Sequence, residues 1–253
     1  MITDDIDSLF SATVLKKHTK SKVRYFYDFS NLYMNGNQDH EVIAVDCAME
    51  RDIKCWDNHV TLFASGDNAN PNSANINNLL QVSRENYFHK YCMGTHLQVI
   101  SYYDAMDFKQ LSDEQKLILW AIDASYKGFY SKYDNDRQMH SWFVELLELE
   151  DLAEVLHRYT MDDVIEVMKK YKLDKKIYFN EEGYLHTEIE LDKLQVQFPE
   201  FDLSLPNDHF TLRKELKSQT KKLDEGKMDY HKSNNLFSFA LTGKNRVSYT
   251  SLK

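Results

Sequence analysis

The chain has 253 residues, of which 42% are hydrophobic and 13% aromatic, and its formal net charge at pH 7 is −9. This apolar content supports a sizeable buried core, and no run of about 18 apolar residues predicts a membrane-spanning helix. The N-terminus carries Asp4, Asp5 and Asp7 where a signal peptide would be basic and apolar, and the three cysteines form no CxxC pair. We therefore expect a cytoplasmic protein without a membrane partner, a disulfide framework or a cysteine-rich zinc site.

Three segments near the N-terminus predict buried strands, because each is a short run of β-branched, aromatic and apolar residues that ends in a polar residue. They are VRYFYDF at 23–29, EVIAV at 41–45 and IKCW at 53–56. The segment Ser65–Asn78 is rich in Asn and Ser and predicts a long loop, of a length that suggests a functional rim.

The pattern changes to helical spacing from Tyr87 onward. One helix is expected within Leu111–Gly128, where Ser112 is the predicted N-cap. Two or three more are expected within Ser141–Tyr171, where Thr160 is a predicted N-cap. Acidic residues follow both caps, as the dipole at a helix N-terminus favours.

The end of the chain is predicted to form a smaller, mixed α+β domain. Strands are predicted at 176–179, 184–191, 236–241 and 246–249, a hairpin turn at 242–245, and a charged helix at 210–223. We expect a domain boundary near residue 173, which divides the chain into residues 1–173 and 174–253.

Charge is distributed unevenly along the chain. The segment Ser204–Lys253 has ten Lys and Arg against five Asp and Glu, a net charge of +5, so the other residues carry −14. This pattern favours an acidic body that holds a metal and a basic segment that holds a phosphate, and a solvated basic surface explains it equally well. Lys244 and Arg246 at the predicted turn, together with Lys90, are the candidate phosphate-binding residues. Aromatic neighbours would let the basic segment hold a nucleotide or a single strand, and core packing explains them equally well.

Acidic and imidazole side chains occur where predicted strands and helices end, the position at which ligands gather in α/β sheets. The candidates are Asp28, Asp46, Asp57 with His59, and Asp123. Carboxylate oxygens and one imidazole nitrogen suit Mn²⁺ or Mg²⁺ better than copper or structural zinc. The alternative for each Asp is a turn or cap residue, and for His59 it is a place in the core.

The order of four segments resembles the DHH phosphoesterases over roughly residues 23–130. VIAVDCAM is similar to the family's second motif, and WDNHVT is similar to its third motif, with Asn in place of the first His. NYFHKYCMGTHLQVISYY is similar to the helix that follows the third motif, and LILWAIDASYKGFYS is similar to the fourth motif. The resemblance implies a mostly parallel sheet flanked by helices, and catalytic roles for Asp57 and His59. It implies Mn²⁺ or Mg²⁺ ligands at Asp28, Asp46, His59 and Asp123.

Two parts of the family pattern are absent. Tyr27–Asn31 stands where the family has a His-x-Asp-x-Asp-Gly turn and offers one carboxylate, and the chain has no GGGH segment. The missing carboxylates favour a single-ion site over the two ions used for in-line displacement at phosphorus, or a descendant that has lost catalysis.

A second group of candidate ligands, His89, Cys92 and His96, lies at helical spacing in HKYCMGTH. No fourth ligand adjoins it, so an incidental grouping is the favoured interpretation. Thr95 in the same segment is, like Lys90, a candidate phosphate contact.

The leading hypothesis is a metal-dependent phosphoesterase or exonuclease that acts on a nucleotide or on a nucleic-acid end. The first alternative is a non-catalytic interaction or inhibitor protein that binds a protein partner through Ser65–Asn78 and Ser141–Tyr171. High Tyr and Asn content is typical of an AT-rich genome, such as that of a low-GC bacterium or its phage, and suits this alternative. The second is a nucleic-acid-binding module. Missing motifs set aside nucleoside triphosphatases, Rossmann dehydrogenases, serine hydrolases and zincins.

Overall fold

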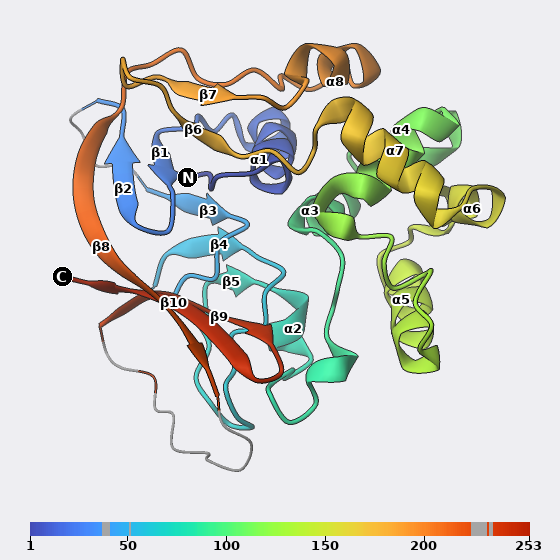
Figure 1. Cartoon of the computed structure of the whole chain (residues 1–253), viewed down its shortest axis with the longest axis horizontal. Helices are drawn as coiled ribbons and strands as arrows, with labels where there is room; N and C mark the ends of the chain where they lie inside the picture. Colours follow the sequence, from blue (N-terminus) through green and yellow to red (C-terminus); the bar gives the residue numbers. More distant parts are fainter. Residues whose placement is uncertain (37–40, 51, 224–231, 233–234) are drawn as a thin grey trace. The chain divides into compact units, whose positions relative to one another are not determined.

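The structure, a computed structural model, describes residues 1–36, 41–50, 52–223, 232 and 235–253 (Figure 1). It divides into two compact units that are both discontinuous in sequence. The first unit consists of Met1–Thr3, Arg24–Tyr91 and Phe210–Lys253. The second consists of Asp4–Val23 and Cys92–His209. The expected division of the chain into folding domains at residue 173 stays a prediction.

The first unit is built around a curled antiparallel sheet that forms a half-barrel. Its strands in spatial order are β1 (Tyr25–Tyr27), β2 (Asn31–Met34), β8 (Thr211–Lys222), β10 (Arg246–Leu252) and β9 (Leu236–Gly243). The first part of β8 pairs with β2, and the rest pairs with β10. Segments from the two ends of the chain therefore share one sheet.

A smaller parallel sheet belongs to the same unit. Its strands are β3 (Ile43–Val45), β4 (Lys54–Trp56) and β5 (Ser73–Ala74), in that order. The short helix α2 (Ile76–Leu79) follows β5, and the 3₁₀ helix η1 (Tyr87–His89) comes later. The three predicted strands near the N-terminus are confirmed as β1, β3 and β4, whereas the predicted loop contains β5 and the start of α2.

The predicted fold, a mostly parallel sheet flanked by helices with a smaller mixed α+β C-terminal domain, is wrong. The chain reverses directly after β1, because the Asp28 carboxylate accepts hydrogen bonds from the backbone N–H groups of Ser30 at 2.8 Å and Asn31 at 2.6 Å. This turn makes β2 pair antiparallel with β1. β1 therefore belongs to the half-barrel, and only β3, β4 and β5 form the parallel sheet.

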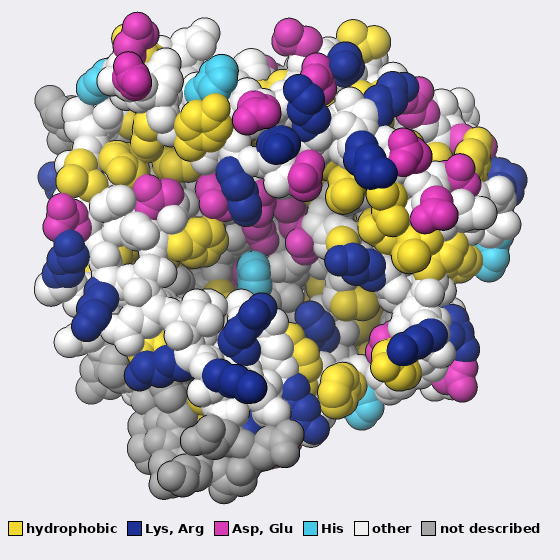
Figure 2. Space-filling view, in the orientation of Figure 1, with side chains coloured by type: hydrophobic (Ala, Val, Ile, Leu, Met, Phe, Trp, Pro, Cys, Tyr) yellow, Lys and Arg dark blue, Asp and Glu magenta, His cyan; other side chains and the backbone are white. Residues whose placement is uncertain are grey.

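The segment predicted to be a charged helix, residues 210–223, is instead strand β8. Leu216 is its one buried residue, and most of its other side chains are exposed. Backbone hydrogen bonds to β2 and β10 define this strand, so no alternation of apolar and polar side chains announces it in the sequence. Figure 2 shows Lys and Arg side chains in dark blue over β8 and over the β9–β10 hairpin.

Two apolar clusters form the core of the first unit. One joins side chains of both sheets and contains Tyr27, Ala44, Cys47, Met49, Cys55, Leu216 and Phe237. The other contains Val60, Phe63, Val82, Tyr87, Leu236, Phe239, Leu241 and Val247. Because β9 contributes to both clusters, its residues from Leu236 to Leu241 are all buried.

The second unit is mostly helical. Its helices are α1 (Ile6–Thr19), α3 (Thr95–Tyr103), η2 (Phe108–Gln110), α4 (Asp113–Ala121), η3 (Ile122–Ala124), α5 (Asp134–Leu146), α6 (Glu150–Arg158), α7 (Met161–Tyr171) and α8 (Leu191–Gln197). Its hairpin consists of β6 (Ile177–Phe179) and β7 (Leu185–Thr187). The predicted N-caps Ser112 and Thr160 are confirmed, each in a capping box. None of the described helices is long and apolar enough to cross a membrane.

A buried pair, Asp7 and His96, joins α1 to the N-terminus of α3. The Asp7 carboxylate accepts hydrogen bonds from the backbone N–H groups of Thr95 and His96, both at 2.7 Å, and lies 2.9 Å from His96 Nδ1. Burial disfavours the charged carboxylate, but the His96 ring and these N–H groups outweigh burial and lower the pKa of Asp7. The Nε2 atom of His96 lies 2.9 Å from the carbonyl oxygen of Leu119. Both nitrogens of this ring therefore have structural partners.

Candidate metal centre

Strands β3 and β4 place two aspartates at the same edge of the parallel sheet. Val45 pairs with Trp56, so the next residues, Asp46 and Asp57, follow neighbouring parallel strands at their carboxyl ends. The N–H of Asp46 donates to the Trp56 carbonyl at 2.9 Å, and that of Asp57 donates to Ala74 at 3.2 Å. Asp46 has φ of 53°, a left-handed conformation that Asp tolerates better than most residues and that ends the strand.

Asp57 and His59 form a hydrogen-bonded pair. The Asp57 Oδ1 atom lies 2.7 Å from His59 Nδ1, and the side chains are 0% and 35% exposed, respectively. The Asn75 side-chain amide donates to Asp57 Oδ2 at 2.8 Å and to the His59 carbonyl at 2.7 Å. A buried carboxylate that is fixed in this way orients the imidazole.

Asp46, Asp57 and His59 converge on one point. Each offers one ligand atom, and these atoms lie within 4.8 Å of one another. In the part of the chain that the structure describes, no other group of three His, Cys, Asp or Glu side chains meets this criterion. Two carboxylates and one imidazole are a donor set that fits Mn²⁺ or Mg²⁺.

The site is anchored to β9 on both sides. Shortly after Asp46, the Ala48 carbonyl accepts a hydrogen bond from the Phe239 N–H at 2.9 Å. Immediately after His59, the Val60 carbonyl accepts one from the Leu241 N–H at 2.8 Å. The two segments that carry the site thus run along the edge of a strand that is buried on both faces, and this limits their movement.

Glu50 supplies a further carboxylate in the same unit, and its side chain is 9% exposed. Its oxygens lie 3.0 and 3.1 Å from Lys232 Nζ, and its N–H donates to the Phe237 carbonyl. Burial raises the pKa of Glu50 to about 7, although Lys232 opposes the rise. Asp57 is close enough to raise this pKa slightly further.

The two buried cysteines of the core are poor candidates for catalysis. Burial, and then the charge of Asp57, raise the pKa of Cys55 to about 12 and that of Cys47 well above its ordinary value. Both thiols therefore stay protonated near neutral pH, whereas nucleophilic attack requires the thiolate.

Two predicted ligands do not belong to this group. Asp28 lies in the first unit, but its carboxylate forms the turn between β1 and β2. Asp123 belongs to the second unit, where it is exposed in η3 with φ of 49°. An Asp at the end of a strand can either bind a metal or stabilise a turn. Asp28 stabilises a turn.

The group His89, Cys92 and His96 is not among the ligand groups of the described residues. His89 lies in η1 of the first unit, whereas Cys92 and His96 belong to the second. His96 contacts Asp7 and the Leu119 carbonyl, so its role is structural. Thr95 donates its N–H to Asp7 at the start of α3.

The three candidate phosphate-binding residues lie around one corner of the first unit. The Lys244 Nζ atom lies 5.1 Å from the centre of the Phe88 ring, and Lys90 Nζ lies 5.2 Å from that of Tyr87. Arg246 pairs with Gly243 across the hairpin turn, and its Nε donates to Thr242 Oγ1. Arg84 donates to the Lys244 carbonyl at 3.2 Å, and this contact ties η1 and its flanking residues to the hairpin.

Asn75 and Glu50 are the residues that sequence reasoning missed. Asn75 lies in the segment predicted to be a loop, but it is the N-cap of α2, and an Asn before an apolar residue is a helix N-cap signal. Glu50 lies next to no motif, so the sequence carries no signal of its burial or of its raised pKa.

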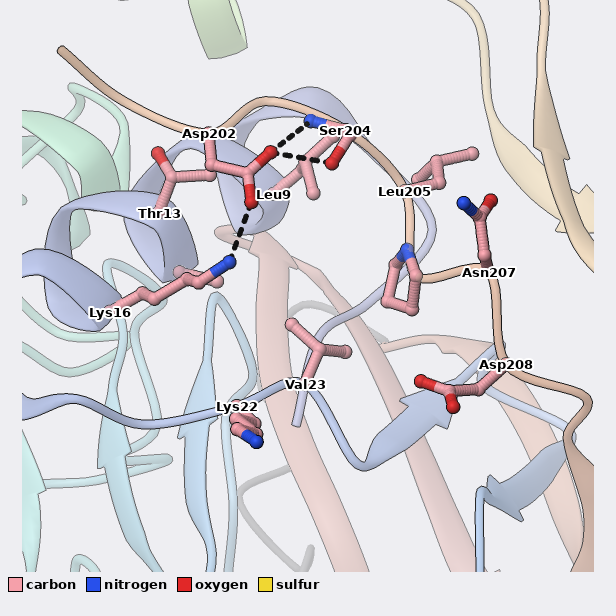
Figure 3. Close-up of a pocket in the computed structure, with 12 residues that line it drawn as sticks. Leu9, Thr13, Lys16, Lys22, Val23, Asp202, Ser204, Leu205, Asn207 and Asp208 are labelled. Atoms are coloured by element: carbon pink, nitrogen blue, oxygen red, sulfur yellow. Dashed lines mark hydrogen bonds and ion pairs between the residues drawn. The ribbon is translucent and has the colours of Figure 1, made fainter.

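A separate hollow of about 270 Å³ lies in the second unit (Figure 3). Leu9 and Thr13 of α1 line it on one side, and the chain from Asp202 to Asp208 lines it on the other. An ion pair of 2.6 Å joins Lys16 to Asp202, whose Oδ1 also accepts from Ser204. The charges of Lys16 and Asp202 offset each other, and no predicted site residue lines the hollow.

Comparisons of the chain with protein-family models, curated proteins and solved structures find no match.

Proposed function

We propose that this protein binds one divalent cation, Mn²⁺ or Mg²⁺, at Asp46, Asp57 and His59, and hydrolyses a phosphate ester of a nucleotide or a nucleic-acid end there. The proposal is carried by the convergence of three donor atoms within 4.8 Å of one another. Two ligands of one such ion lie at most about 4.2 Å apart, so a small rotation of one side chain completes the set.

The surrounding residues suit a hydrolytic site. Asn75 and the Asp57 carboxylate fix the His59 ring, whose partial exposure leaves it in contact with solvent. A bound cation would lower the pKa of a coordinated water and supply hydroxide near neutral pH. Asp57 is buried and accepts a hydrogen bond from the Asn75 amide, so its carboxylate is held in place beside His59.

The basic hairpin supports an anionic substrate. The Leu241 N–H donates to the Val60 carbonyl, which directly follows His59, and Lys244 lies three residues beyond Leu241. The backbone thus ties a positively charged turn to the segment that carries the candidate site. Positive charge beside a metal site attracts and orients a phosphate ester.

A second candidate function is cation binding without turnover, in an interaction or inhibitor protein. It is favoured by Asp28, whose carboxylate is engaged in a turn and does not add to the site. The DHH phosphoesterases that the sequence resembles use two ions, and in-line displacement at phosphorus is assisted by two.

Calorimetric titration with Mn²⁺ and with Mg²⁺, paired with hydrolysis of a generic phosphodiester, tests both candidates. The wild type is expected to bind one ion and to release product, and Asp46→Asn and His59→Gln are expected to lose both properties. Asp123→Asn is the matched control, because it removes a predicted ligand that lies in the other unit, and it should behave like the wild type. Absence of cation binding by the folded wild type overturns both candidates. Binding without turnover selects the second.

The cysteines support a cytoplasmic location, which we include in the proposal. Among the residues that the structure describes, Cys47, Cys55 and Cys92 form no disulfide. A reducing compartment maintains this state.

A further inference from the structure

We infer that the substrate of the candidate site is single-stranded nucleic acid, held by a surface that we call the Phe88 patch. The patch consists of Arg84, Phe88, Lys90, Lys244 and Arg246. This inference rests on the proposed function, because it names the substrate class of that site.

The first observation is an exposed aromatic ring among cations. Phe88 is 60% exposed, and Lys244 Nζ lies 5.1 Å from the centre of its ring. A ring held in this way offers a stacking surface to a base, and the cation beside it offers a contact to the adjoining phosphate. Bases of a duplex are stacked on each other, so this arrangement favours a single strand.

The second observation concerns the charge of three basic side chains in the patch. Among the residues that the structure describes, no ion pair involves Lys90, Lys244 or Arg246. Lys54, an exposed lysine of the same unit, differs from these three residues because it forms an ion pair with Glu41. Unpaired cations at one corner are available to neutralise phosphates and release their counterions.

The third observation is the continuation of the charge along β8. Arg246 pairs with Lys222 at the end of that strand. The basic residues of β8 are Arg213, Lys214, Lys217, Lys221 and Lys222, and all five are exposed. Lys221 Nζ lies 5.5 Å from the centre of the Tyr249 ring on β10, which repeats the pairing of cation and aromatic ring. Twelve residues of strand span about 40 Å, enough for several nucleotides of a stretched strand.

The position of the patch connects it to the chemistry. The hairpin that carries Lys244 begins at β9, and the Leu241 N–H of β9 is bonded to the Val60 carbonyl, next to His59. Tyr87, beside Phe88, reaches the same strand through its hydroxyl, which donates to the Leu241 carbonyl at 3.4 Å. A single-stranded nucleic acid bound to the patch would thus contact the hairpin whose strand β9 is hydrogen-bonded to the segment that carries His59.

Fluorescence anisotropy with a labelled oligo-dT of about ten nucleotides tests the inference, and the assay contains EDTA so that binding is separated from hydrolysis. The wild type is expected to bind it and to bind a duplex of equal length less tightly. Phe88→Ala should weaken binding about fivefold or more. The double variant Lys244→Ala with Arg246→Ala should reduce the salt dependence, with a slope smaller by about 1.4 in log K against log salt.

Matched controls are Phe29→Ala, which removes another exposed phenylalanine of this unit, and Lys54→Ala, which removes a paired lysine. Both should bind like the wild type. Equal binding by Phe88→Ala and wild type, or tighter binding of the duplex, overturns the inference while leaving cation binding untouched. Retained oligonucleotide binding without any hydrolysis in Mn²⁺ supports the nucleic-acid ligand and overturns the enzymatic part of the proposed function.

Discussion

Asn75 shows how a single amide can determine the geometry of a site. Its side chain donates to Asp57 Oδ2 and to the His59 carbonyl, while its Oδ1 accepts from the N–H groups of Asn77 and Asn78. One residue therefore begins α2 and orients two of the three proposed ligands.

We predict that Asn75→Ala weakens Mn²⁺ binding by about tenfold to a hundredfold, because the carboxylate and the ring lose the groups that fix them. Loss of the N-cap should also lower the free energy of unfolding by about 1 kcal/mol. Calorimetric titration measures the first effect. Asn72→Ala, which changes an exposed asparagine of the same loop, is the control, and unchanged cation affinity in Asn75→Ala would contradict the role assigned to Asn75.

Glu50 predicts a pH dependence of stability. Its pKa rises from the ordinary value of 4.5 to about 7 in the folded protein, mainly through burial. Below about pH 4.5 the carboxyl is protonated in both states. Between about pH 4.5 and 7 the unfolded chain loses the proton first, so the free energy of unfolding falls as pH rises, by about 3 kcal/mol in total.

Urea unfolding at pH 5 and at pH 8 measures this effect. In Glu50→Gln the contribution of residue 50 to the difference between the two pH values should disappear. Glu215→Gln, which changes an exposed glutamate, should keep the wild-type difference. A wild-type difference that persists in Glu50→Gln would show that other groups cause it.

The sequence predicted the three residues that converge in the candidate site, among others. Asp46, Asp57 and His59 follow short apolar runs, and that signal was enough to group them. Asp28 gives the same signal, but its carboxylate is used locally in a turn, a role that depends on the backbone conformation of Ser30 and Asn31. Residue type alone does not separate a ligand from a turn.

Among the helices, strands and turns, the sequence predicted correctly those features that depend on residues close together in the chain. The capping boxes at Ser112 and Thr160 and the turn between β9 and β10 depend on residues within a few positions of each other. β8 depends instead on hydrogen bonds to β2, roughly 180 residues earlier, and its exposed side chains carry no periodic pattern. For that reason its sequence predicts a charged helix instead of a strand.

The start of α3 provides a test of packing. A Cβ atom at Gly94 would approach the ring of His96 and would lie 2.9 Å from Asp7 Oδ2, too close for either buried group to keep its position. We predict that Gly94→Ala lowers the free energy of unfolding by about 1–3 kcal/mol. Gly243→Ala is the control, since its Cβ would meet Arg246 Cβ at an ordinary 3.7 Å. Equal urea midpoints for the two variants would contradict the prediction.

At the scale of the whole molecule, the fold class was beyond what sequence patterns specify. β1, β3 and β4 are similar short apolar runs, yet β1 joins an antiparallel sheet and the other two a parallel one. Which partner a strand pairs with depends on segments distant in the chain, and the apolar runs themselves do not encode it. The C-terminal strands complete a sheet begun near the N-terminus, a pairing that the apolar runs do not encode either.

The division into two units makes a prediction about cation binding. A ligand that binds the folded state stabilises it by about 2.7 kcal/mol at a concentration of 100 Kd, and the gain falls on the segments that hold the ligand. In the first unit, the N–H groups of Asp46, Asp57 and Leu241 donate the backbone hydrogen bonds that hold the segments of the candidate site in place. We expect saturating Mn²⁺ to slow hydrogen exchange at these amides.

Hydrogen exchange followed by mass spectrometry or NMR measures the change. The control amide is that of Ala105, which donates to Ile100 in the second unit and should exchange at the same rate with and without Mn²⁺. In Asp57→Asn the slowing should vanish, because a neutral amide cannot replace the buried carboxylate as an anionic ligand. If the Asp46, Asp57 and Leu241 amides exchange at unchanged rates while calorimetry detects a bound ion, the ion lies elsewhere and the assigned centre is wrong.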